Sequence, residues 1–217
     1  TDFIYDNRKE FYASALKDFT DISVREKSGL KIVKNLTGRN ATLLPDPTLM
    51  LSKKDWDKIA KKPRESRYIL IYLMNAREEV LHFAEALSKK TGLRVLNITD
   101  DNSSSIKAKG IHNAGPIEFL GYFSNAEYVI TNSFHGLMFS IIYRKSVYVD
   151  IPKGKNTTYE RLTNILDELG ISDRYIADLS IDFVPQKIEY SEIEGNISKL
   201  QNKTKEFIKR NLIGEIR

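Results

Sequence analysis

The sequence predicts an α/β fold built on a parallel sheet, because short apolar runs alternate with helical patterns from residue 68 onward. The apolar runs are YILIYLM, LRVLNIT, EYVIT and SVYVDI. Strands separated by helices in this order require crossover connections, which are right-handed in nearly all proteins. The region therefore predicts a Rossmann-like, doubly wound parallel sheet.

Local signals place the helices between and after these strands. REEVLHFAEALSKKTG ends at Gly92, and GPIEFLGYFSNA has Pro116 in its first turn, where a missing amide hydrogen costs no hydrogen bond. Two more helices are predicted over GLMFSIIYRK and YERLTNILDELGI. The last segment predicts a long helix with one apolar face that needs a surface to cover it. That face comprises Ile193, Ile197, Leu200, Thr204, Phe207 and Ile208.

The first 62 residues follow a different pattern. FTDISVREKSGLKIVKNLTGR predicts a short strand followed by a helix that ends near Gly38. ATLLPDPTLML predicts a strand closed by the turn Pro45-Asp46-Pro47. Ser52 can then cap a short helix, and Pro63 follows the end of that helix. This last stretch is the best candidate for a linker.

Composition excludes several classes of protein. Hydrophobic residues make up 41% of the 217 residues, which is enough for a packed core and excludes wholesale disorder. The net charge of +5 is spread over helical faces and favours a small anionic ligand over nucleic acid. Without cysteine there is no disulfide or thiolate metal site, and no apolar run reaches the ~20 residues of a membrane span. The N-terminus lacks both a signal-peptide pattern and a starting methionine, so we expect a cytoplasmic protein that has lost an upstream region.

His135 is the leading candidate for a functional residue, since it follows the predicted strand EYVIT, and parallel sheets bind ligands at the carboxyl ends of their strands. Asn132, Ser133 and the backbone near Gly136 add polar groups at the start of the next helix, where an anion is favoured. A histidine at this position suits phosphate or carboxylate binding, or general acid–base catalysis. The residues alone equally allow a structural role, in which His135 caps the helix or satisfies a buried carbonyl.

Two arginines are candidates for anion binding. Arg25 follows a short strand and opens a helix, although a surface ion pair with Glu26 is the simpler interpretation. Arg161 lies early in a predicted helix and could reach an anion from another side. His82 is expected on a helix surface, and His112 in a loop before a helix. No dinucleotide, P-loop, zinc-protease or nucleophile-elbow motif is present, and no metal site or cofactor is predicted.

Several of these stretches, taken in order, resemble the polysaccharide pyruvyl transferase family. They are DISVREKSG at 21–29, LPDPTLML at 44–51 followed by DW, the strand YILIYL, and GPIEFLGYFSNAEYVITNSFHGLMFSIIYRKSVYV at 115–149. The resemblance extends over residues 20–180. It implies one half of a GT-B-like architecture of two Rossmann-like domains. Residues 1–62 would then be the end of an otherwise missing N-terminal domain plus the linker, and residues 63–217 the C-terminal, donor-binding domain.

The resemblance also implies an activity, which is transfer of a pyruvyl group from phosphoenolpyruvate to a sugar of a cell-surface exopolysaccharide or capsule, or to its lipid-linked precursor, forming a ketal. It implies that His135 is catalytic and that Arg25 binds the donor. Members often have an arginine two residues before the histidine, at the position where this chain has Ser133. Arg161, Lys153 or Lys155 could take over the role of that arginine. The full set of expected donor-binding residues is Arg25, Asn132, Ser133, Phe134, Gly136 and Arg161.

Two other functions are compatible with the same residues. A nucleotide-sugar glycosyltransferase of the GT-B type would also place a donor phosphate at a helix start in its C-terminal domain. A non-catalytic sugar- or partner-binding module could keep the fold without the reaction.

Overall fold

A five-stranded sheet forms the centre of the computed structural model, which describes residues 4–98, 108–151, 159–180 and 182–212. The strands are β3 (Tyr68–Tyr72), β4 (Arg94–Ile98), β5 (Lys109–Ile111), β6 (Tyr128–Thr131) and β7 (Ser146–Val149). Their spatial order is β5-β4-β3-β6-β7, and every pair is parallel. The predicted doubly wound parallel sheet is thus confirmed, with the strand order reversing between β3 and β6.

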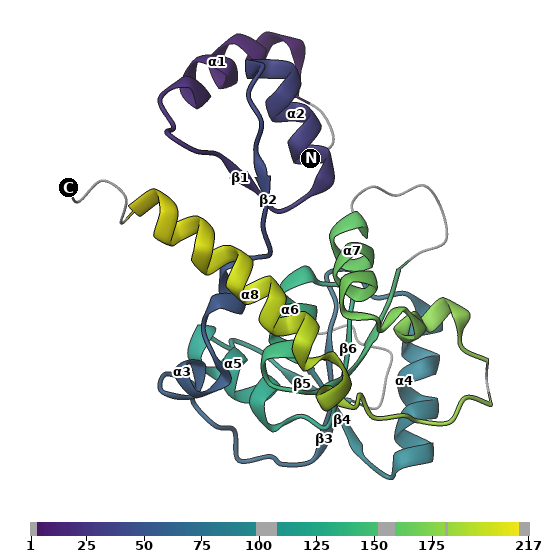
Figure 1. The fold of residues 1–217 in the computed structure, drawn as a ribbon. Helices are drawn as coiled ribbons and strands as arrows, with labels where there is room; N and C mark the ends of the chain where they lie inside the picture. Colours follow the sequence, from purple (N-terminus) through teal and green to yellow (C-terminus); the bar gives the residue numbers. More distant parts are fainter. Residues whose placement is uncertain (1–3, 99–107, 152–158, 181, 213–217) are drawn as a thin grey trace.

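Helices cover both faces of this sheet, as Figure 1 shows. Along β3, Tyr68 and Leu70 face one side and Ile69 and Ile71 the other, and all four are fully buried. The first side packs against α5 (Pro116–Asn125), α6 (Phe134–Ile142), α7 (Glu160–Leu169) and α8 (Tyr190–Leu212). The second packs against α4 (Glu78–Thr91). Strand β5 was not predicted, because it has only three residues.

Helix α6 lies unusually close to the ends of β3 and β6. The Thr131 hydroxyl donates a hydrogen bond to the carbonyl oxygen of Tyr72 at 2.6 Å and accepts one from the Ser133 amide at 3.0 Å. A side chain at Gly136 would overlap that hydroxyl and place a Cβ 3.0 Å from Thr131 Cβ. Only glycine fits this position, so the start of α6 is fixed against the switch point of the sheet.

A smaller unit precedes the sheet and stands apart from it in Figure 1. It consists of α1 (Asp6–Lys17), β1 (Ser23–Val24), α2 (Lys27–Thr37) and β2 (Thr42–Leu43), with β1 and β2 paired in parallel. Helix α2 ends as predicted at Gly38, whose φ of 70° is left-handed. Helix α1 was not predicted, and none of its residues is buried.

The segment between the two units packs against the larger one. The strand predicted before the turn Pro45-Asp46-Pro47 is the short β2, and the residues after that turn form the 3₁₀ helix η1 (Pro47–Met50). Helix α3 (Lys53–Asp57) is the short helix predicted next. Ser52 caps α3 as predicted, in a capping box with Asp55. Gln201 of α8 donates a hydrogen bond to the Leu49 carbonyl oxygen at 2.8 Å. The predicted long terminal helix is confirmed as α8, and among the described residues no helix is both long and apolar enough to span a membrane.

Replacing Gly136 with alanine should destabilise the protein by about 1–3 kcal/mol, because the new methyl group forces α6 away from β6. Gly195→Ala in α8 is the matched control, since no atom lies within 4 Å of the added Cβ. The control should be neutral or stabilising by up to about 1 kcal/mol, as expected for alanine in an exposed helix. Urea denaturation measures both. Equal stability of the two variants would contradict the close approach of α6.

Candidate functional site

Asp46 lies at the centre of a charged cluster between the two units. Its Oδ1 accepts hydrogen bonds from the amide and hydroxyl of Thr48, at 3.0 and 2.8 Å. Its Oδ2 forms an ion pair with Arg25 and lies 4.0 Å from Nε2 of His135. Burial acts to raise the pKa of the Asp46 carboxyl, but the hydrogen bonds from Thr48 and Arg25 outweigh it and the pKa is lowered. Asp46 is therefore a fixed negative charge.

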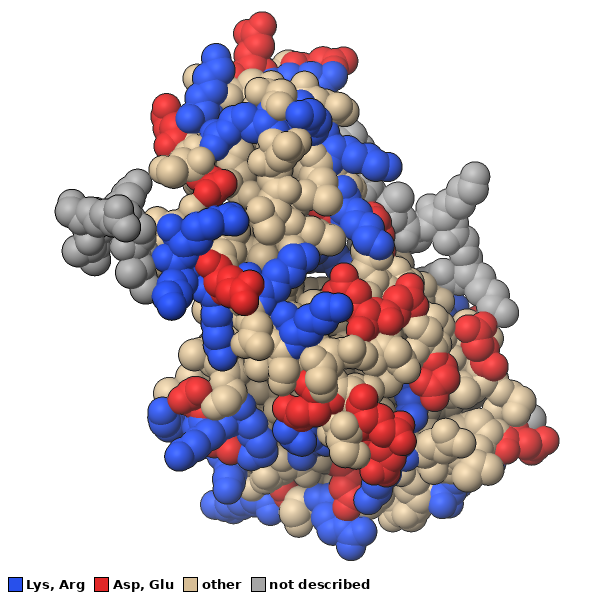
Figure 2. Space-filling model, in the orientation of Figure 1, with Lys and Arg blue, Asp and Glu red and all other residues tan. Residues whose placement is uncertain are grey.

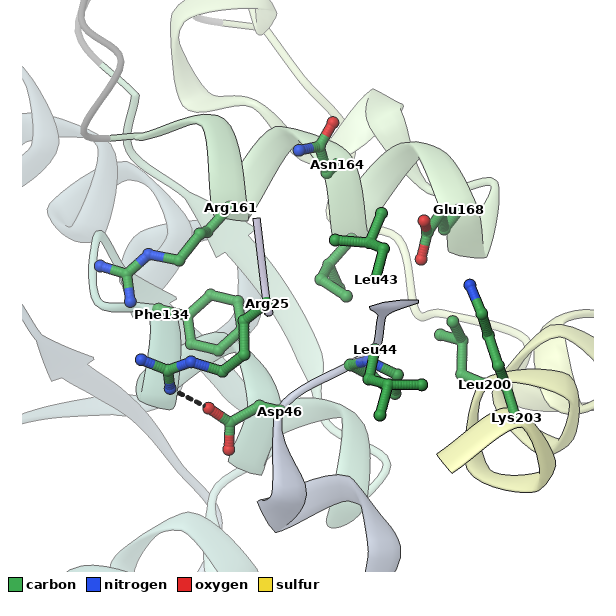
Figure 3. A pocket seen from close by; sticks show the side chains of 12 residues that line it. Arg25, Leu43, Leu44, Asp46, Phe134, Arg161, Asn164, Glu168, Leu200 and Lys203 are labelled. Atoms are coloured by element: carbon green, nitrogen blue, oxygen red, sulfur yellow. Dashed lines mark hydrogen bonds and ion pairs between the residues drawn. The ribbon is translucent and has the colours of Figure 1, made fainter. Parts of the chain in front are cut away.

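Two guanidinium groups meet at the ring of Phe134. The Cζ atoms of Arg25 and Arg161 lie 6.0 and 5.2 Å from the ring centroid, and both groups extend toward the ring in Figure 3. Nε of Arg161 lies 3.0 Å from Oε1 of Glu26. The consecutive residues Arg25 and Glu26 thus form ion pairs with two different partners, Asp46 and Arg161.

These side chains come together because three strands end at the same place. Arg25 follows β1, and Asp46 follows β2 after two intervening residues. Phe134 and His135 open α6, which follows β6 after two intervening residues, and Arg161 lies in the first turn of α7. Parallel strands gather ligands at their carboxyl ends, and here the carboxyl ends of both sheets contribute to one cluster.

The cluster is accessible but tightly packed. The side chains of His135 and Arg25 are 52% and 42% exposed, whereas that of Asp46 is 3% exposed. Arg25, Arg161 and Phe134 border a cavity of about 30 Å3, which is large enough for one or two water molecules. On the face shown in Figure 2, basic and acidic side chains are intermingled rather than gathered into one basic surface.

The structure brings four of the predicted site residues together, namely Arg25, Phe134, His135 and Arg161. The other three hold the ends of the strands. The Asn132 side chain accepts a hydrogen bond from the Met74 amide at 2.8 Å and donates one to the Asn75 carbonyl at 2.9 Å. Ser133 caps α6 through the Gly136 amide at 3.4 Å. A donor-binding role of these three residues stays a prediction.

The sequence did not point to Asp46. A surface pair of Arg25 with Glu26 was the alternative to a donor-binding role for Arg25; the structure pairs Arg25 with Asp46, and Arg161 with Glu26. The signal for Asp46 was its place in DPT, where an aspartate before proline caps the following turn. Lys153 and Lys155 lie outside the described residues.

The other two histidines lie away from this cluster. His82 is 67% exposed on α4, and His112 follows β5, three strands away from β6. Within the described part of the chain, no group of three or more histidine and acidic side chains could hold a metal ion.

A family model described as polysaccharide pyruvyl transferase matches residues 1–149, which is more than half of the chain. The chain belongs to the polysaccharide pyruvyl transferase family. Arg25 and His135, the two side chains that meet at Asp46, both lie within the matched residues. No curated protein is significantly similar to the chain.

Three solved structures resemble the fold at low sequence identity. The glycotransferase of kitacinnamycin is 16% identical over 70% of this chain, with a TM-score of 0.40. UDP-GlcNAc 2-epimerase from Methanocaldococcus jannaschii is 12% identical over 87%, with a TM-score of 0.44. The iron-containing dodecameric glycosyltransferase TibC from enterotoxigenic E. coli H10407 is 16% identical over 80%, with a TM-score of 0.31. The chain covers 45%, 60% and 52% of these proteins, respectively.

The Asp46→Asn variant should lose about 1 kcal/mol of stability at pH 7, because the amide still caps η1 but no longer pairs with Arg25. The pKa of Asp46 in the folded protein lies below the ordinary aspartate value of 3.8, so the carboxylate stabilises the fold above that pH. This stabilisation is lost as the pH falls through the native pKa, and the difference between wild type and variant should then vanish. Urea denaturation from pH 7 to pH 3 measures it.

The matched control places the same substitution in an Arg25→Met background. In that background, Asp46→Asn should lower the free energy of unfolding by clearly less than in wild type, because the ion pair is already absent. An equal cost in both backgrounds would show that the pair contributes nothing to stability.

Proposed function

We propose that this chain carries the donor site of an enzyme that transfers a pyruvyl group from phosphoenolpyruvate to a sugar of a cell-surface polysaccharide or its lipid-linked precursor. The observation that carries the proposal is the meeting of Arg25, Arg161 and His135 around Phe134 and Asp46. Membership of the pyruvyl transferase family supports it.

The two arginines suit the charge of this donor. Phosphoenolpyruvate carries a phosphate and a carboxylate on the same carbon atom, C2, and guanidinium groups bind both with paired hydrogen bonds. Since Arg25 and Arg161 both lie within 6.0 Å of the centre of one aromatic ring, a single small ligand can reach both. In this proposal Arg161 supplies the positive charge that relatives place at the position of Ser133.

The reaction needs a proton donor, which we assign to His135. Two sugar hydroxyl oxygens form bonds to C2 of the donor, the bond from C2 to the phosphate oxygen breaks, and the methylene carbon gains a proton to become a methyl group. Of the two protons that the hydroxyls release, one balances the methyl group and the other leaves with inorganic phosphate. A half-exposed imidazole beside a fixed carboxylate can give a proton to the methylene carbon or to the departing phosphate.

The proposal also covers the location of the reaction, the domains and the acceptor. Phosphoenolpyruvate is a cytoplasmic metabolite, so we place the reaction in the cytoplasm. We assign residues 63–217 to a C-terminal, donor-binding Rossmann-like domain and residues 1–62 to the end of a preceding domain plus its linker, together half of a GT-B-like arrangement. The acceptor is a sugar or a lipid-linked oligosaccharide, and no nucleic acid takes part.

In full-length protein, phosphoenolpyruvate binding measured by calorimetry should weaken by about tenfold, ~1.4 kcal/mol, in both His135→Ala and Arg161→Met. The exposure of the His135 side chain means that its removal should leave the fold intact. His82→Ala and Arg144→Met are the controls, since both residues are exposed and pair with acidic residues elsewhere. Uridine diphosphate should not bind. Binding of the nucleotide without phosphoenolpyruvate would instead indicate glycosyl transfer.

A further inference from the structure

We propose that Glu26 is an internal competitor of the donor, a displaceable carboxylate that occupies Arg161 until an anionic ligand takes its place. This inference rests on the proposed function, because it concerns the same donor site. It assigns opposite effects to the two carboxylates of the cluster, with Asp46 aiding donor binding and Glu26 opposing it.

The charges of the cluster balance without a ligand. Arg25 is paired with Asp46, and Arg161 is paired with Glu26 at 3.0 Å. Within these two printed pairs, the positive and negative charges are equal in number. A donor bearing a phosphate and a carboxylate adds at least two more negative charges, which repel any carboxylate a few ångströms away. Tight binding requires that one of the two carboxylates moves out.

Asp46 cannot move without breaking local structure. Its side chain is 3% exposed, caps η1, and accepts two hydrogen bonds from Thr48 besides the pair with Arg25. Rotating it away would leave a buried cap and a buried carboxylate unsatisfied. Asp46 therefore stays and holds Arg25 in place.

Glu26, unlike Asp46, does not cap the element that follows it. Its side chain is 20% exposed, and although Glu26 occupies the N-cap position of α2, that side chain makes no capping hydrogen bond. The hydroxyl of Ser28 donates to Oε2 at a long 3.3 Å. Glu26 can thus leave Arg161 without exposing the end of a helix.

The space around the cluster fits this exchange. The cavity bordered by Arg25, Arg161 and Phe134 is about 30 Å3, too small for a phosphoryl group. A hollow of about 300 Å3 adjoins Glu26 and is lined also by Ser23, Val24 and Gly29. The carboxylate has room to rotate into this hollow, which leaves the Nε edge of Arg161 open for the donor.

The test compares Glu26→Gln with wild type in the full-length protein, using calorimetry with inorganic phosphate and with phosphoenolpyruvate. Glutamine keeps the size of the side chain but removes its charge. Both ligands should bind Glu26→Gln on the order of fivefold more tightly, as expected for the loss of one partly exposed competing ion pair. Glu168→Gln is the matched control, because Glu168 lines the same cavity and its loss changes the net charge equally. The control should change binding less than twofold.

Asp46→Asn should have the opposite effect to Glu26→Gln. It should weaken binding of both ligands, because Arg25 loses the partner that positions it. If wild type binds phosphoenolpyruvate and Glu26→Gln binds it equally or more weakly, Glu26 positions Arg161 rather than competing for it. That result overturns the inference and leaves the proposed function standing. If neither ligand binds wild type or any variant, the donor site itself is refuted, and the inference with it.

Discussion

The close approach of α6 to the ends of β3 and β6 is the constraint on which the rest of the site depends. Gly136 lies against Thr131, and the hydroxyl of Thr131 in turn ties β6 to the Tyr72 carbonyl of β3. This contact fixes where α6 begins. Phe134 is consequently buried under the two guanidinium groups while His135, the next residue, points toward solvent. If α6 lay further from the sheet by the width of one side chain, it could not bury Phe134 and expose His135 together.

Electrostatics adds a second level of organisation. Each arginine of the cluster belongs to a different unit, and each pairs with a carboxylate supplied by the other. Asp46 comes from the segment that packs on the larger unit and holds Arg25 of the smaller one. Glu26 of the smaller unit reaches Arg161 of the larger. These two crossed pairs tie the smaller unit to the larger one in a defined orientation.

Strands and helices with a buried face could be predicted from the sequence, because burial leaves a periodic apolar pattern, as it does over Ile69–Ile71 and in α8. Helix α1 buries nothing and so left no such pattern. His135 was found because it lies at the start of the helix that follows a strand. Asp46 was not found from the sequence, because its main partner, Arg25, is distant in sequence. Its hydrogen bonds with Thr48 form a turn that becomes part of the cluster only when the two units meet.

The hydrogen bond from Gln201 to the Leu49 carbonyl joins residues 152 positions apart. Leu49 belongs to η1, the turn that Asp46 caps, so the last helix of the chain supports the segment that carries Asp46. A chain emerging from the ribosome can form the five strands of the sheet first, because all of them precede α8 in the sequence. The segment that carries Asp46, by contrast, gains the hydrogen bond from Gln201 only once α8 has been made. Its support therefore depends on a helix that is synthesised after the five strands of the sheet.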